Sequence, residues 1–82
     1  MRNEDLLQRI TTHPDVMVGK PVIRGTRLTV PYVLGLLARG ATAEEILGEY
    51  SGLTREDIQA CLLFASLSLE QASFLPTMKE AV

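Results

Sequence analysis

Residues 31–73 contain three successive runs of apolar residues at helical spacing, each with its own start and stop signals. The first run follows Pro31, a residue suited to the first helical position, and stops at Gly40. A capping box at Thr42–Glu45 precedes the second run, and Thr54 opens the third and longest. These signals predict a core of three helices joined by short turns.

The preceding residues 1–30 lack a sustained helical period. The first nine favour a weak helix capped by Asn3. Two β-prone runs, 22–23 and 28–30, flank Gly25-Thr26, which suits a two-residue type II′ hairpin turn. We therefore expect a mainly α fold with a small β part. An N-terminal β-hairpin arm (1–30) precedes a three-helix, helix-turn-helix core (31–73) of homeodomain-like or winged-helix-like type, and residues 74–82 form a tail.

Length and composition favour a single domain over residues 1–82. The sequence is 46% hydrophobic with only four Phe and Tyr residues and no Trp, so its core must be aliphatic. It contains no run of 18 apolar residues that could span a membrane, and its start lacks the apolar segment of a signal peptide. One cysteine excludes an internal disulfide. A cytoplasmic protein is expected.

Charge is distributed unevenly along the chain. Residues 1–40 carry six basic and three acidic side chains, whereas residues 41–82 carry two basic and seven acidic ones. Lys20, Arg24 and Arg27 concentrate positive charge at the hairpin, where the predicted turn makes the two arginines cross-strand neighbours. They suit DNA phosphates or an acidic protein surface. Alternatively, one arginine pairs with Asp15 or with an acidic residue of the helical half.

The last two predicted helices have the layout of a helix-turn-helix, a tight turn followed by a capped longer helix. Arg55 and Gln59 would then face DNA bases from the start of the second helix. Glu56 and Asp57 make that helix start net acidic, which opposes binding to a polyanion. Plain helix packing is the alternative interpretation of this layout.

The third helix is apolar on nearly all sides. A core stripe is predicted at Ile58, Cys61, Leu62, Ala65 and Leu69. A second apolar set remains outside that stripe: Ala60, Leu63, Phe64 and Leu67. A second copy of the chain, in a homodimer, or a partner protein is expected to cover this set. Alternatively, the N-terminal arm folds over it.

No pattern in the chain predicts catalysis, a metal or a cofactor. Gly19-Lys20 lacks the upstream glycine and the following hydroxyl of a phosphate-binding loop. His13 has no second ligand and precedes a proline in a turn, so we expect it to face solvent. Cys61 lies in an apolar run, where a thiol is an inert core residue. An enzyme is therefore not expected.

One long motif resembles a known family. It runs through Gly19-Lys20-Pro21-Val22-Ile23-Arg24-Gly25-Thr26-Arg27 and continues with Glu44-Glu45-Ile46-Leu47 and Leu53-Thr54-Arg55-Glu56-Asp57-Ile58. Residues 6–72 are similar to the small prokaryotic family called domain of unknown function 433. Two positions depart from the family pattern: Val18 stands where a glycine is common, and Ser51 where a proline is common.

The resemblance implies a helix-turn-helix-type fold with a short β-arm and an antitoxin role of the VapB type. Members are often encoded beside a PIN-like ribonuclease toxin. One region would bind and inhibit the toxin, and another would bind promoter DNA. The first hypothesis is thus a non-enzymatic antitoxin-like regulator, and the alternative is a protein–protein interaction module that binds no DNA.

Overall fold

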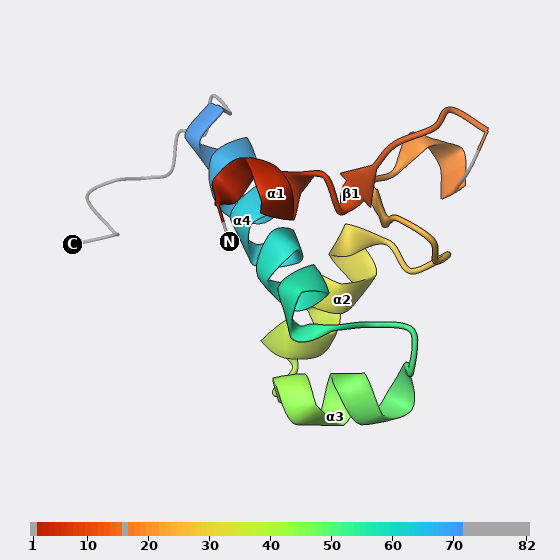
Figure 1. The fold of residues 1–82 in the computed structure, drawn as a ribbon, viewed down its shortest axis with the longest axis vertical. Helices are drawn as coiled ribbons and strands as arrows, with labels where there is room; N and C mark the ends of the chain where they lie inside the picture. The colour runs from red at the N-terminus through yellow and green to blue at the C-terminus, as the bar shows by residue number, and fades with distance from the viewer. Residues whose placement is uncertain (1, 16, 72–82) are drawn as a thin grey trace.

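A computed structural model describes residues 2–15 and 17–71. It is mainly helical, with a small antiparallel sheet near the N-terminus followed by helices, as the sequence predicts (Figure 1). The elements in chain order are α1 (Asn3–Leu7), β1 (Ile10–Thr11), the short 3₁₀ helix η1 (Met17–Gly19), β2 (Val22–Ile23), α2 (Val30–Ala38), α3 (Ala43–Glu49) and α4 (Arg55–Gln71). The predicted tail lies outside the described residues, as do the last two residues of the predicted third helix.

The sheet consists of β1 and β2, with Ile10 opposite Ile23 and Thr11 opposite Val22. Val22 also forms an isolated bridge with Thr29, on the other side of β2. The predicted pairing of 22–23 with 28–30 is therefore present in part, as this bridge, but β1 is the main partner of β2. Two-residue strands are too short for side-chain alternation to reveal this pairing from the sequence.

The hairpin turn differs from the prediction. The Thr26 N–H donates to the Ile23 carbonyl at 3.0 Å, which makes Arg24 and Gly25 the central residues. Gly25 has φ +83° at the second central position, as in a type II turn. The Thr26 hydroxyl donates to the same carbonyl and accepts from the Leu28 N–H. These extra bonds widen the loop to residues 24–27, so Gly25-Thr26 is not a two-residue turn.

Side-chain caps begin the three long helices. The Thr29 hydroxyl accepts from the Tyr32 N–H, and Thr42 forms its predicted capping box with Glu45. Before α4, Thr54 and Asp57 cap each other's backbone amides reciprocally. Small boundary shifts separate prediction and structure: Arg2 rather than Asn3 precedes α1, Pro31 is the second residue of α2, and α3 ends at Glu49, before Gly52.

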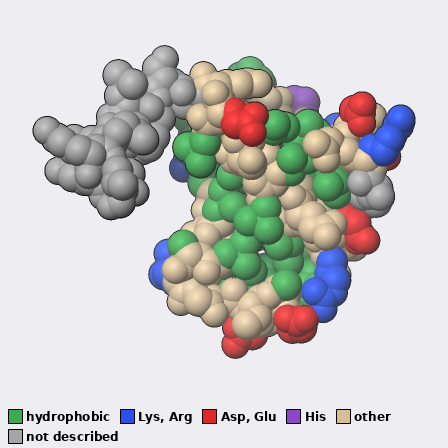
Figure 2. Space-filling model, turned by 90° about the vertical axis from the view of Figure 1, so that its left-hand side faces the viewer, with side chains coloured by type: hydrophobic (Ala, Val, Ile, Leu, Met, Phe, Trp, Pro, Cys, Tyr) green, Lys and Arg blue, Asp and Glu red, His purple; other side chains and the backbone are tan. Residues whose placement is uncertain are grey.

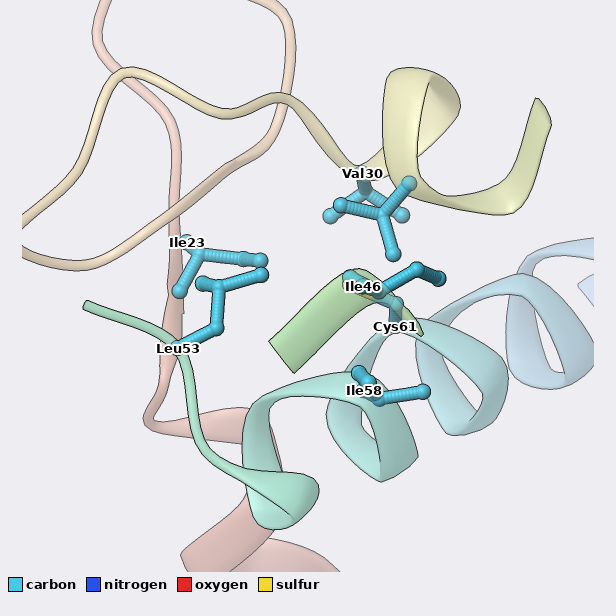
Figure 3. Packing of buried hydrophobic residues seen from close by; sticks show 7 residues of the cluster. Ile23, Val30, Ile46, Leu53, Ile58 and Cys61 are labelled. Atoms are coloured by element: carbon cyan, nitrogen blue, oxygen red, sulfur yellow. The ribbon is translucent and has the colours of Figure 1, made fainter. Parts of the chain in front are cut away.

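An aliphatic cluster joins the N-terminal segment to the helices. Ile23 and Leu53 point toward each other, and Ile46, Ile58 and Cys61 continue the cluster across α3 and α4 (Figure 3). Ile23 is only 1% exposed. The N-terminal segment is therefore anchored to the helices through β2, which supplies part of the common core, whereas residues 12–15 and 18–20 are exposed.

The buried face of α4 differs from the predicted core stripe. Ala60 is fully buried, whereas Leu62 and Leu69 are exposed by 51% and 63%. The reason is that α4 is covered from two directions, by α1 and β1 and by α2 and α3. The buried arc is therefore centred near Asp57, Ala60 and Cys61, and the predicted interface role of Ala60 is wrong.

Candidate functional site

The basic residues of the hairpin do not form one patch with Arg24 and Arg27 side by side. The Arg24 Nε donates to the Gln8 carbonyl at 2.8 Å, and its guanidinium lines an open groove of about 580 Å³. Arg27 lines a separate depression beside Leu28 and Tyr32. The widened turn explains the divergence, since it takes both residues out of cross-strand pairing.

Lys20 and Arg27 are exposed, and neither forms an ion pair within residues 2–15 and 17–71. Across these same residues, Arg24 pairs with no carboxylate, and Asp15 forms no ion pair. The expected alternative, in which internal acids neutralise the hairpin arginines, is therefore not realised here. Lys20 and Arg27 retain their charge for an external anion.

A partly buried ion pair, Arg9–Asp57, lines the groove beside Arg24. The Arg9 Nη1 lies 3.1 Å from the Asp57 Oδ1, whose side chain is only 10% exposed. The other Asp57 oxygen accepts from the Thr54 N–H at 3.0 Å, and the Arg9 carbonyl accepts from the Arg24 N–H. Asp57 thus caps α4 and ties it to the N-terminal segment. From the sequence alone, Asp57 is considered only as part of the net acidic start of this helix.

The start of α4 holds the two predicted base-facing residues. Arg55 donates from Nη2 to the Glu44 Oε2 at 2.7 Å, across the turn from α3. This hydrogen bond lowers the pKa of Glu44 and raises that of Arg55. Gln59 is exposed one turn later. Reading a base with Arg55 therefore requires breaking or sharing its ion pair, while Gln59 is available as it stands.

A tyrosine pair was missed by sequence reasoning. The Tyr32 and Tyr50 hydroxyls lie 2.6 Å apart, and the two rings meet edge to face with centroids separated by 6.2 Å. This hydrogen bond raises the pKa of Tyr50. The pair links the start of α2 to the end of α3. Eighteen residues separate the two tyrosines, so no local spacing signals the contact.

An apolar groove of about 340 Å³ lies between the N-terminal segment and α4. Its lining residues are Leu7, Ile10, Phe64, Leu67, Ser68 and Gln71. Two of the predicted interface residues, Phe64 and Leu67, are therefore half-covered by α1 and β1, and Leu63 is half-buried as well. The N-terminal segment, which was the alternative to a second chain, therefore covers part of this apolar surface of α4. It leaves the groove itself open.

Figure 2 shows a face on which hydrophobic side chains gather in a band along the molecule, with charged side chains mainly toward its margins. An apolar band with a charged rim is typical of surfaces that bind other proteins.

Possible metal ligands do not cluster within the described part of the chain. Residues 2–15 and 17–71 contain no group of three His, Cys, Asp or Glu placed to hold a metal ion. Cys61 is fully buried, and burial raises the pKa of its thiol to about 11, so the predicted core position of this cysteine is confirmed. His13 is exposed, with its Nε2 lying 3.3 Å from the Thr11 hydroxyl. In the same residues, no helix is long and apolar enough to cross a membrane.

Comparison with known proteins places this arrangement in a family. Residues 10–65, which include both strands and most of α4, match the family described as "Protein of unknown function (DUF433)". The chain belongs to this family. The match confirms the resemblance drawn from the Gly19–Arg27 motif, and the DUF433 description assigns no activity.

Two relatives support the membership. The uncharacterized protein y4eO of Sinorhizobium fredii is 36% identical over 56 residues, which are 68% of this chain. The aligned part spans only 25% of y4eO, so this chain corresponds to about a quarter of that relative. The crystal structure of a DUF433 member from Anabaena variabilis superimposes with a TM-score of 0.73 at 34% identity, covering 83% of this chain and 67% of the other.

Proposed function

We propose that this DUF433 protein is a non-enzymatic, cytoplasmic antitoxin-like regulator that binds and neutralises a PIN-like ribonuclease. The supporting observation is the apolar groove between α1 and α4. Phe64 and Leu67 line it with apolar side chains, and Ser68 and Gln71 add polar groups to its lining. An apolar surface edged by polar groups suits an inserted helix or loop of a partner.

A nuclease inhibition assay tests the proposal. The neighbouring reading frames are searched for a PIN-like nuclease, which is mixed with the protein, and cleavage of a labelled RNA is followed. We expect an equimolar amount to suppress cleavage, and Leu67→Lys to weaken inhibition at least tenfold, because a charge would be placed in the apolar groove.

The matched control is Ala38→Lys, which adds the same side chain at an exposed position of α2. It should inhibit as the unmodified protein does, and circular dichroism must show that both variants stay folded. Undiminished cleavage with a tenfold excess of unmodified protein would contradict the proposal.

Promoter binding is the second part of the proposed function. It is supported by the short turn between α3 and α4, by exposed Gln59, and by Lys20 and Arg27, which form no ion pair within the described residues. The Arg24 and Arg55 side chains already have intramolecular partners. We therefore assign phosphate contacts first to Lys20 and Arg27, with Arg24 and Arg55 contributing only after rearrangement.

Salt dependence distinguishes this regulator from a module that binds protein alone. Labelled upstream DNA is titrated at several salt concentrations, with and without the nuclease. Each lost phosphate contact lowers, by about 0.9, the magnitude of the slope of the logarithm of the binding constant against the logarithm of the salt concentration. The double variant Lys20→Ala/Arg27→Ala should therefore reduce this slope by about 2. Arg2→Ala, which removes an exposed arginine paired with Glu4 and Asp5, is the control. No mobility shift at low salt would favour the pure interaction module.

A further inference from the structure

We propose that two copies of this chain associate through an antiparallel pairing of their α4 helices, on a face distinct from the α1/α4 groove. Five exposed residues define this face, here called the α4 stripe: Arg55, Gln59, Leu62, Ser66 and Leu69. Successive members are four, three, four and three residues apart. This 3.5-residue average is the spacing at which two helices pack along a common seam.

The apolar members of the α4 stripe are unusually exposed for their size. Leu62 and Leu69 lie seven residues apart, exposed by 51% and 63%. Burial of each leucine in a helix pair is favourable. Between them Ser66 has a small side chain, which allows a second helix to approach closely.

The charges at the two ends of α4 favour the antiparallel orientation. Arg55 stands at the N-terminal end, and Glu70 is exposed beside Leu69 at the C-terminal end. Parallel pairing would place like charges and like helix-dipole ends together, whereas antiparallel pairing brings Arg55 to the partner's Glu70. The Arg55 guanidinium has further N–H donors beyond the one bonded to Glu44, so it can serve both carboxylates.

This pairing also fixes a register. Placing Arg55 opposite the partner's Glu70 centres the two-fold axis between Leu62 and Leu63. Leu62 then packs against the same region of the partner, and Gln59 meets the partner's Ser66. Leu69 covers the aliphatic stem of the partner's Arg55.

The size of the α4 stripe sets the expected affinity. A helix of 17 residues is about 25 Å long. A seam of that length is smaller than the ~800 Å² per partner of a standard stable interface, so we expect a dissociation constant in the micromolar range. This self-association does not rest on the proposed nuclease inhibition. Because it covers Arg55 and Gln59 of both copies, these two residues do not contact DNA bases in the dimer, and promoter contact is left to Lys20 and Arg27.

Sedimentation equilibrium of the full chain from about 1 to 500 μM tests the proposal. The mass should rise with concentration from 9.0 kDa toward twice that value. The double variant Leu62→Asp/Leu69→Asp should remain monomeric throughout, and because both positions are exposed its helical content should be unchanged. The groove variant Leu67→Lys is the control, and it should dimerise normally.

Two further measurements test the register. Under mild oxidation Leu62→Cys, beside the proposed two-fold axis, should form a disulfide-linked dimer at least fivefold faster than Leu69→Cys. Arg55→Glu and Glu70→Arg should each weaken association, and their combination should restore it.

Three outcomes would overturn the proposal: a mass of 9.0 kDa at every concentration, a dimer that survives the double Asp variant, or a dimer broken by Leu67→Lys. Equal cross-linking at positions 62 and 69 would overturn the antiparallel register. A monomeric protein whose double Asp variant loses nuclease inhibition would assign the α4 stripe to the nuclease instead. Failed inhibition with intact self-association would contradict only the proposed function.

Discussion

Cys61 shows how burial, together with the nearby charge of Asp57, changes the pKa of a residue. It lies in α4 among Ile46, Ile58 and Val33, and burial raises the pKa of its thiol to about 11. The unfolded thiol ionises near its ordinary pKa of about 8.5. Above that pH the unfolded chain gains stability from the thiolate, and the folded chain does not. The free energy of unfolding should therefore fall as the pH rises from about 8.5 toward 11.

The variant Cys61→Ala isolates this effect. At pH 7 it should be about 1 kcal/mol less stable than the unmodified protein, because it leaves a small void. At pH 10 this difference should shrink or reverse by about 1–2 kcal/mol, since the alanine variant has no thiol to ionise. Urea unfolding under reducing conditions at both pH values measures it. Ile58→Val serves as the control, and its stability difference should not change with pH. If the free energy of unfolding of Cys61→Ala fell between pH 7 and pH 10 as much as that of the unmodified protein, this explanation would be contradicted.

Val18 and Arg24 show which single residues the sequence could not place. Val18 has φ +57° and is 91% exposed, a left-handed conformation that a β-branched residue rarely adopts. The family's usual glycine suits this position, although the sequence alone does not reveal the φ value. The Arg24 side chain bonds the Gln8 carbonyl, 16 residues away. Such a contact depends on how two segments meet, which no local pattern records.

At the scale of elements, capping signals were the most reliable part of the sequence. Thr42 with Glu45 and Thr54 with Asp57 mark true helix starts, because a side chain must satisfy the exposed amides there. The partner of β2 and the buried face of α4 were not predictable in this way. Both depend on α1 and β1, whose apolar pattern is too short to show where they pack.

Two glycines test the element-level description. Gly25 occupies the turn with φ +83°, so Gly25→Ala should cost about 1 kcal/mol of stability. Gly48 lies in α3, and a Cβ at this position would meet no other atom. Gly48→Ala should therefore raise the free energy of unfolding by about 0.5–1 kcal/mol, because alanine favours the helix more than glycine does. Urea denaturation followed at 222 nm compares the two. Since the same atom is added in both variants, effects of equal sign would contradict either the turn or the α3 boundary.

At the scale of the whole molecule, the uneven charge does not divide the protein into two parts. The basic N-terminal segment and the acidic helical segment meet through the Arg9–Asp57 ion pair and through the packing of Ile23 on Leu53 (Figure 3). Arg27, exposed between half-buried Thr26 and Leu28, is therefore held beside the packed core, whereas Lys20 lies in an exposed stretch. For Arg27, this arrangement favours electrostatic contact from a fixed surface.

A shared core has a consequence for unfolding. Ile23 in β2 and Ile58 in α4 belong to one buried cluster, so removing a methyl group from either should destabilise the entire chain. We expect Ile23→Val and Ile58→Val each to lower the free energy of unfolding by about 1 kcal/mol. Each should give a single urea transition in which helical circular dichroism and exchange of the Val22 and Ile23 amides change together. Thr12→Ala, at an exposed position of the same N-terminal segment, should change stability by less than about 0.5 kcal/mol. If Ile23→Val released the strand amides while α4 kept its stability, the N-terminal segment would be a separate unit. Arg27 would then lie on a mobile support, and the argument for a fixed surface would fail.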